Sequence, residues 1–292
     1  MKTSEVIKWL DATFHPEYQE DYDNAGFLLG DSASDYKGAL VALDLTPAVV
    51  DEAVRLGMSL IVTHHPFIFS GVKRLTDASE TGRMVMTLAK NDISVYAAHT
   101  NLDNLPWGVS GVLAEKLGLT DCRILRQSFV DKFDVDKLIG SCPNNIHDIV
   151  STYQHINVST DNVGAGMVGE LPAAMHVADF LKRVKEVIGL PFVRVSEEAY
   201  RDASLQVRRV ALCGGSGAEF IDDAKRAGAD IYLTGDLKYH DFQRGGRMVL
   251  ADIGHYESEQ FAKDIIFRAI SEKFSNFACR ISETQQGIVK YI

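Results

Sequence analysis

The sequence predicts an α/β protein made of two similar halves, each with a mostly parallel sheet flanked by helices. Three observations support this fold class. The 292 residues, 46% of them hydrophobic, are enough to bury a sizeable core in about two domains. One segment of the chain occurs twice, and each copy alternates strand-like with helix-like runs.

The repeated segment is the main evidence for two halves. Residues 49–65 match residues 220–236 without a gap, at a constant offset of 171, and a Val-Ala-Leu triplet precedes both copies. Gly57 and Gly228 follow the helical runs, where a helix end favours a left-handed residue. Each copy therefore predicts a β-α-β unit, and a further helix and strand follow it.

The predicted division of the chain lies at residues 121 and 122. The first half, 1–121, and the second half, 122–292, are joined without a low-complexity linker, so we expect them to pack together. The segment near 122–209 is less regular. Within it, the glycines of 164–169 predict a turn-rich stretch, whereas 177–188 has the apolar spacing of a helix that ends at Gly189.

Charge and cysteine usage exclude several classes of protein. The formal net charge is −10 and no basic stripe is present, which argues against a nucleic-acid partner. No apolar run is long enough for a membrane span or a signal peptide. The four cysteines are widely scattered and form no Cys-x-x-Cys pair, so we expect reduced thiols and a cytoplasmic protein.

Ligand-type side chains follow three of the predicted strands. The carboxyl ends of parallel strands meet at one edge of a sheet, which is where sites form in open α/β folds. Imidazole and carboxylate groups there suit zinc, iron or manganese, and two adjacent histidines with two separated carboxylates suggest two divalent ions. The candidate ligands are His64, His65, Asp103, His255 and Glu259.

Each of these features also has a simpler interpretation. A histidine pair is often a surface or cap feature, and His99 is either a satisfied strand-end histidine or a ligand-type group. His255 and Glu259, four residues apart and so on one helix face, can be an ordinary helix-start pair. Their shared placement at strand ends favours the metal site.

Two further loops are candidates for substrate contact. Gly215 and Ser216 follow a strand and precede a helix, a context in which backbone amides bind phosphate, although a tight turn needs the same small residues. Asp236, Lys238 and His240 follow another strand. His240 is the candidate for proton transfer, and Asp236 and Lys238 lie near the same presumed cavity.

The order of these motifs resembles the Nif-three-like family, whose members are also called GTP cyclohydrolase 1 type 2 homologs. The resemblance covers nearly the whole chain and rests on six motifs, at residues 23–27, 63–66, 99–103, 213–217, 235–241 and 254–259. It implies a toroidal homohexamer with a dinuclear metal site facing the interior cavity. By motif, it assigns the metal to the same five ligands.

Two functions from different classes remain open. The first is a metal-dependent hydrolase of a nucleotide or related heterocycle, as the family name implies, in which His240 or His99 would move protons. The second is a non-catalytic protein that stores or delivers metal or acts as a regulatory scaffold. The weak phosphate-loop signal and the lack of a clear general base favour the second.

Overall fold

The computed structural model describes residues 1–128, 163–201, 204–284 and 287–290. Contacts divide the chain into two compact units. Unit 1 contains Met1–Leu102 and Ala262–Ile292, and unit 2 contains the described residues between 103 and 261. None of the helices in the described part of the chain has the length and apolar character needed to cross a membrane.

Unit 1 contains a five-stranded sheet in the order β1-β4-β3-β2-β11. All pairings are parallel except that of β1 with β4. The three central strands are buried along their whole length, as expected for a parallel sheet covered on both faces. The strands are β1 (Gly26–Leu29), β2 (Gly38–Ala42), β3 (Leu60–Thr63), β4 (Ser94–Ala97) and β11 (Ala278–Ile281).

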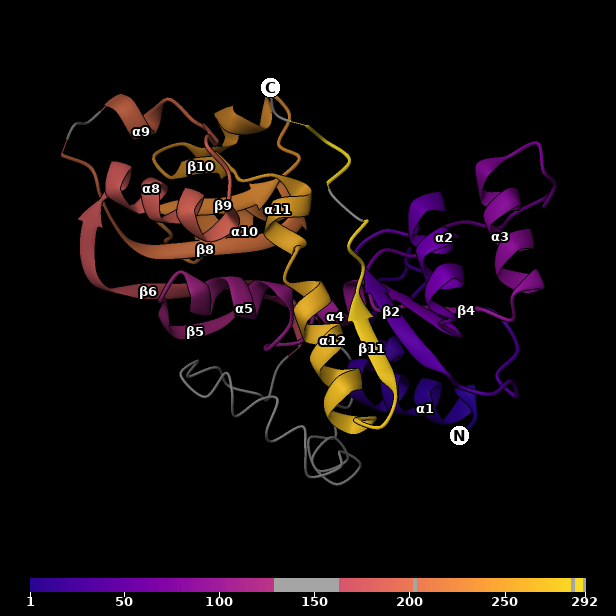
Figure 1. The fold of residues 1–292 in the computed structure, drawn as a ribbon. Coiled ribbons are helices and arrows are strands. Elements are labelled where there is room, and N and C mark those ends of the chain that lie inside the picture. Colours follow the sequence, from indigo (N-terminus) through magenta and orange to yellow (C-terminus); the bar gives the residue numbers. More distant parts are fainter. Residues whose placement is uncertain (129–162, 202–203, 285–286, 291–292) are drawn as a thin grey trace. The chain divides into compact units, whose positions relative to one another are not determined.

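Helices cover the sheet of unit 1. One face packs against α2 (Pro47–Leu56) and α3 (Glu80–Lys90), and its core includes Leu40, Ile61 and Val95 from alternate strand positions. On the other side, α1 (Thr3–Phe14) is tied to α12 (Ala262–Lys273) by the Trp9 indole, which donates to the Ala269 carbonyl at 2.9 Å. Figure 1 shows these two helix pairs. The unit also contains the short η1 (Pro16–Tyr18) and the first three residues of α4 (Thr100–Asp103).

Unit 2 contains a six-stranded mixed sheet in the order β5-β6-β8-β9-β10-β7. Its centre, β8-β9-β10, is parallel, whereas β5, β6 and β7 add antiparallel pairings. The parallel character predicted for both halves therefore extends through only part of this sheet. The strands are β5 (Thr120–Gln127), β6 (Gly164–His176), β7 (Arg194–Val195), β8 (Gln206–Ser216), β9 (Ile231–Gly235) and β10 (Val249–Asp252).

The helices of unit 2 lie against both faces of its sheet. One face packs on η2 (Ala218–Phe220) and α10 (Ile221–Arg226), around a core that includes Tyr232 and Leu250. The remaining elements of the unit are α5 (Val109–Lys116), α8 (Val177–Ile188), α9 (Glu198–Arg201), η3 (Asp241–Gly245) and α11 (His255–Glu259), seen in magenta to orange in Figure 1.

The two copies of the repeated segment form β-α-β units with the same strand register. Ala39 pairs with Leu60 across β2 and β3, and the residues 171 positions later, Val210 and Ile231, pair across β8 and β9. The Val-Ala-Leu triplets are offset by two residues in this register, so they lie on equivalent faces but not at equivalent positions. The helix of the first copy ends at Gly57, as predicted. Gly57 has the left-handed conformation expected at a helix end, with φ +65°.

The segment after residue 121 is more regular than the sequence predicts. The glycine-rich stretch 164–169 is part of the 13-residue strand β6, because its small residues allow close approach of neighbouring strands: a Cβ at Gly169 would lie 2.6 Å from the Cys122 Sγ. The helix predicted at 177–188 is confirmed as α8. Residues 129–162 lie outside the described part of the chain.

The unit boundary differs from the predicted division at 121 and 122, which falls within β5. The sequence pattern does not reveal that the C-terminal β11 pairs with β2 and so joins unit 1. Pairing between segments distant along the chain depends on tertiary contacts that local periodicity does not encode.

The C-terminal segment of unit 1 is held to α2 by one buried carboxylate. Glu52 is 3% exposed and accepts hydrogen bonds from the Ser282 and Thr284 hydroxyls and from the Glu283 amide. Burial raises the pKa of Glu52, but these hydrogen bonds outweigh it, and the pKa lies below its ordinary value of 4.5. The ionised carboxylate therefore stabilises the folded state.

We predict that Glu52→Gln lowers the free energy of unfolding at pH 7 by about 2 kcal/mol, the scale of hydrogen bonds to a charged group. Because the folded pKa is depressed, this stabilisation is present above pH 4.5 and is lost as pH falls through the folded value. Urea unfolding of both proteins at several pH values should show the difference shrinking in acid. Asp51→Asn, at the exposed neighbouring carboxylate, is the matched control, and an equal loss there would contradict the prediction.

Candidate metal centre

Three histidines gather at the carboxyl ends of β3 and β4 in unit 1. His64 and His65 directly follow β3, and His99 lies two residues beyond β4. One ring nitrogen from each lies within 4.8 Å of the other two, and the ring centroids are 5.0–5.3 Å apart. The structure thus brings together the predicted ligand pair and the predicted catalytic His99.

Each of the three rings is oriented by a hydrogen bond at Nδ1. His64 Nδ1 donates to the Ala98 carbonyl at 2.7 Å, a group that can only accept, so this ring carries its proton on Nδ1. His65 Nδ1 pairs with Asp44 at 2.7 Å, and His99 Nδ1 with Asp23 at 2.8 Å. For His64 this leaves the lone pair on Nε2, and hydrogen bonds from Nδ1–H to an oxygen are typical of histidines that bind metals.

Asp23 is the most deeply buried of these orienting groups, with a side chain 0% exposed. Burial raises its pKa, but hydrogen bonds from His99, Thr100 and the Asn24 amide outweigh burial and lower the pKa to about 2. Asp23 is therefore ionised at neutral pH. A buried carboxylate in this state fixes both the tautomer and the orientation of His99.

Unit 2 has its own cluster of ligand-type residues at the end of β9 and in α11. His255 Nε2 lies 2.9 Å from Glu259 Oε2, and its Nδ1 lies 2.7 Å from Asp236. Burial lowers the pKa of His255, but the Glu259 and Asp236 carboxylates outweigh burial and raise it to about 9. A cation that binds this imidazole therefore has to displace a proton.

Glu259 packs directly against the glycine turn at the end of β8. Gly215 has φ +63°, and a Cβ there would lie 1.9 Å from Glu259 Oε1, so both backbone conformation and space require glycine. The Gly215 amide donates to Ser258 Oγ at 2.9 Å, and the Gly214 amide to Ser110 Oγ at 3.3 Å. These contacts agree with a close-packed turn, and substrate contact at Gly215 stays a prediction.

The remaining predicted residues lie in unit 2. Asp103 is the last residue of α4, and its carboxylate, with that of Glu259, adds to burial in raising the pKa of Cys213. Lys238 and His240 are exposed on the turn that leads into η3, where the His240 ring is T-shaped to Tyr239. Ser216 is exposed at the end of β8.

The free cysteines Cys122, Cys213 and Cys279 agree with the expectation of reduced thiols, and Cys142 lies outside the described residues.

The two orienting carboxylates, Asp23 and Asp44, are not among the site residues that the sequence predicts. Asp23 belongs to one of the six motifs, and Asp44 lies two residues beyond β2, as His65 lies two residues beyond β3, so the strand-end rule applies to Asp44 as well. Two exposed aromatic rings were also missed. Phe69 lies edge-on to His99, with centroids 6.0 Å apart, and stacks on Tyr22 at 6.3 Å.

The fold and the strand-end histidines define a class of α/β proteins that can hold a metal ion. The family model for Duf34/NIF3 (NGG1p interacting factor 3) matches residues 1–287, and the chain belongs to this family.

Known proteins similar to this chain agree with that assignment. A GTP cyclohydrolase 1 type 2 homolog of Clostridium perfringens is 32% identical over 262 residues, covering 89% of this chain and 87% of its own. A Streptomyces coelicolor protein of the same name is 33% identical over 261 residues, with coverage of 88% and 81%. The solved structure of a Staphylococcus aureus hypothetical protein, 28% identical, has a TM-score of 0.81 over 100% of this chain and 99% of its own.

We predict that Gly215→Ala destabilises the protein more than a glycine replacement of equal backbone strain. Gly189→Ala is the matched control, because Gly189 has φ +77° and a Cβ there would meet nothing within 4 Å. The control should cost about 1 kcal/mol from the left-handed conformation alone. Gly215→Ala should cost about 3 kcal/mol, since the methyl group must also displace Glu259. Urea unfolding measures both, and equal losses would contradict the packing of Glu259 on this turn.

Proposed function

We propose that this protein is a divalent-metal protein with a dinuclear centre and that it hydrolyses a nucleotide or a related heterocycle. The observation that carries the proposal is the cluster of His64, His65 and His99, each with Nδ1 held by an oxygen acceptor. Imidazoles such as those of His64 and His65 are donors that zinc, iron and manganese accept, and His99 beside them is the group proposed for proton transfer. The proposed ligands are His64, His65, Asp103, His255 and Glu259.

The donor chemistry of the described residues fits two cations. The proposed ligands comprise the imidazoles of His64, His65 and His255 and the carboxylates of Asp103 and Glu259. Carboxylates can bridge two cations and offset their charge. When bound, such ions lower the pKa of a coordinated water and polarise a substrate oxygen.

The residues around the centre supply orientation and proton transfer. Asp44 orients the proposed ligand His65 through Nδ1, and Asp23 orients His99 in the same way, which suits the general-base role proposed for His99. His240, exposed on its turn, and Lys238 are the proposed groups for a second proton transfer and for contact with an anionic substrate.

Two aromatic rings support a planar substrate. Phe69 is 49% exposed and Tyr22 is 60% exposed, although large aromatic side chains usually bury most of their surface. Phe69 contacts His99 edge-on, so its exposed surface adjoins the histidine cluster. The side-chain amide of Asn24 holds the segment before Phe69 by donating to the Ile68 carbonyl at 2.6 Å. A heterocyclic base stacked on these rings would lie next to the metal ligands.

A second candidate function is metal storage or delivery. His65 is 22% exposed and His255 is 36% exposed at the side chain, so solvent and an acceptor protein can reach ligand-type groups. Rapid transfer of bound metal to an acceptor would favour this function, and metal retained through many turnovers would favour the hydrolase. The cytoplasmic location and the homohexamer belong to the same proposal, and the mass of the purified assembly tests the latter.

We expect protein purified without chelator to contain about two divalent ions per chain. His64→Ala and Glu259→Ala should each lower that content while circular dichroism remains unchanged, because each change removes a proposed ligand and leaves the helices and strands in place. The matched control is His176→Asn, which removes an imidazole elsewhere but keeps a side chain able to cap α8. Metal analysis by mass spectrometry gives the content. No bound metal after reloading would refute the dinuclear site.

We expect metal-loaded protein to hydrolyse at least one member of a panel of nucleotides, nucleosides and phosphoesters that includes GTP, and His64→Ala to lose that activity. Phe69→Leu should raise KM by about tenfold with little change in kcat, because stacking on a base contributes about 1–3 kcal/mol to binding. Its metal content should equal that of the wild type. An inactive panel, or His64→Ala as active as the wild type, would exclude the hydrolase and leave metal storage or delivery.

A further inference from the structure

Helix α8 of unit 2 has an apolar surface in addition to the face that packs into the core. Its core face is formed by Val177, Phe180, Val184 and Ile188, all of which are buried. The next stripe at helical spacing is formed by residues 178, 181, 182 and 185. That stripe lines a pocket of about 480 Å³, within the range of small-molecule sites.

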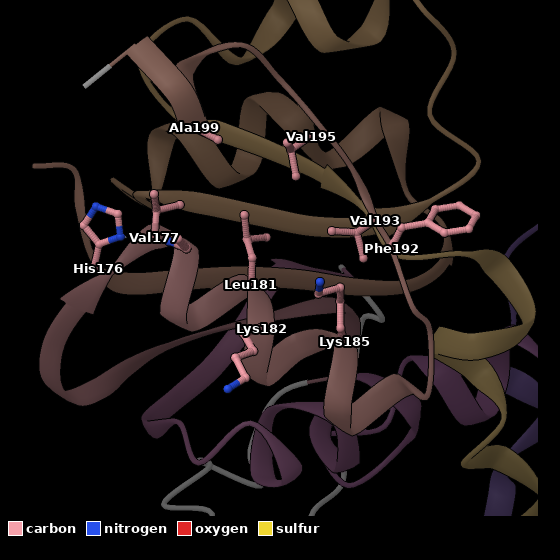
Figure 2. A pocket seen from close by; sticks show the side chains of 10 residues that line it. His176, Val177, Leu181, Lys182, Lys185, Phe192, Val193, Val195 and Ala199 are labelled. Carbon is pink, nitrogen blue, oxygen red and sulfur yellow. Dashed lines mark hydrogen bonds between the residues drawn. The ribbon is translucent and has the colours of Figure 1, made fainter. Parts of the chain in front are cut away.

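The opposite wall of the pocket is the segment that contains β7. Figure 2 shows Leu181 on the side of α8 that faces this segment, where Val193 and Val195 lie, with the Phe192 ring at one end. Val195 pairs with Ala251, so β7 is fixed to the edge of the sheet. Aliphatic side chains on both walls make the interior apolar.

Hydrogen bonds anchor both walls of the pocket. The Ser196 amide donates to the Leu250 carbonyl at 2.8 Å, and the Leu250 amide donates to Ser196 Oγ at 3.0 Å. At the far end of α8, the Gln260 side chain donates to the Ile188 carbonyl at 3.0 Å. The two walls are therefore held in place without a ligand, and a preformed pocket reduces the entropic cost of binding.

The charge of the pocket is opposite to that of the protein. The chain carries a net charge of −10, yet the lining contains Lys182, Lys185 and His176 and no carboxylate. Across the described residues, neither lysine forms a salt bridge. The helix dipole favours a cation such as Lys185 in the last turn. The helix dipole does not explain why the aliphatic side chains of Leu181, Val193 and Val195 remain partly exposed beside Lys185.

We propose that this pocket binds an aliphatic carboxylate of about ten carbon atoms, a size that matches its volume. The chain would lie against Leu181, Val193 and Val195, and the carboxylate would pair with Lys185 and Lys182. An apolar interior with a cationic edge favours an anionic amphiphile over an uncharged or cationic one. The site consists only of unit 2 residues and does not depend on the metal centre.

Titration of the full-length, metal-loaded protein with decanoate by calorimetry tests the proposal. We expect saturable binding of one decanoate per chain, and no binding of decyltrimethylammonium, which has the same chain length and the opposite charge. Lys185→Gln should weaken decanoate binding about tenfold, since one charged contact is lost. Leu181→Gln should weaken it as well, and Lys90→Gln, at the end of α3, should leave it unchanged.

Two results would overturn the proposal, and a further measurement would then reassign the surface. Equal binding of decanoate and decyltrimethylammonium would indicate apolar partition without a charge-selective site. No binding of decanoate to the wild type would exclude the carboxylate. A change in oligomeric mass in Lys185→Gln, with no decanoate bound by the wild type, would assign the surface to contact with a second copy of the chain. Circular dichroism of each variant shows that it is folded.

Discussion

The parallel register of β3 and β4 is the constraint on which the histidine cluster depends. Thr63 pairs with Ala97, so the residues that follow them, His64 and Ala98, leave the sheet side by side. The Ala98 carbonyl then accepts the Nδ1 proton of His64, a ring that is 0% exposed. One hydrogen bond to a backbone carbonyl therefore fixes the tautomer of a buried imidazole. The sheet holds this carbonyl in place, whereas a water molecule or a flexible side chain would be less precisely positioned.

The same β-α-β register serves a different chemistry in unit 2. At the positions where unit 1 has His64 and His65, unit 2 has Gly235 and Asp236, and Asp236 holds His255 as Asp44 holds His65. The equivalent of Asp44 is Gly215, whose missing side chain leaves room for Glu259. A common backbone thus presents imidazoles in one unit and carboxylates with one imidazole in the other.

One strained backbone position lies beside these groups. Asp236 has φ +55°, a left-handed conformation that is uncommon outside glycine, and it directly follows β9. Gly215 has a similar φ, and Glu259 packs on it. Such positions persist where surrounding contacts over-determine the backbone, and they cluster at functional sites. The contacts of His255 with Asp236 and Glu259 supply part of that determination.

The sequence by itself determined the two β-α-β units, their terminal glycines and the strand-end histidines. These features are local. Hydrophobic periodicity, a helix stop signal and the residue after a strand can each be recognised from a segment of about twenty residues. The helix at 177–188 was predicted correctly for the same reason. The dinuclear ligand set and the roles of His240 and Lys238 stay predictions.

Only the tertiary structure decided which carboxylate orients which imidazole, because Asp23 and His99 are 76 residues apart. It also decided that 164–169 is a strand, since glycines that indicate a turn in isolation permit close approach when a neighbouring strand is present. The return of β11 to the first sheet and the pocket beside α8 have the same origin. In each case the deciding interaction joins residues that are far apart in sequence, and the local sequence pattern does not predict such contacts.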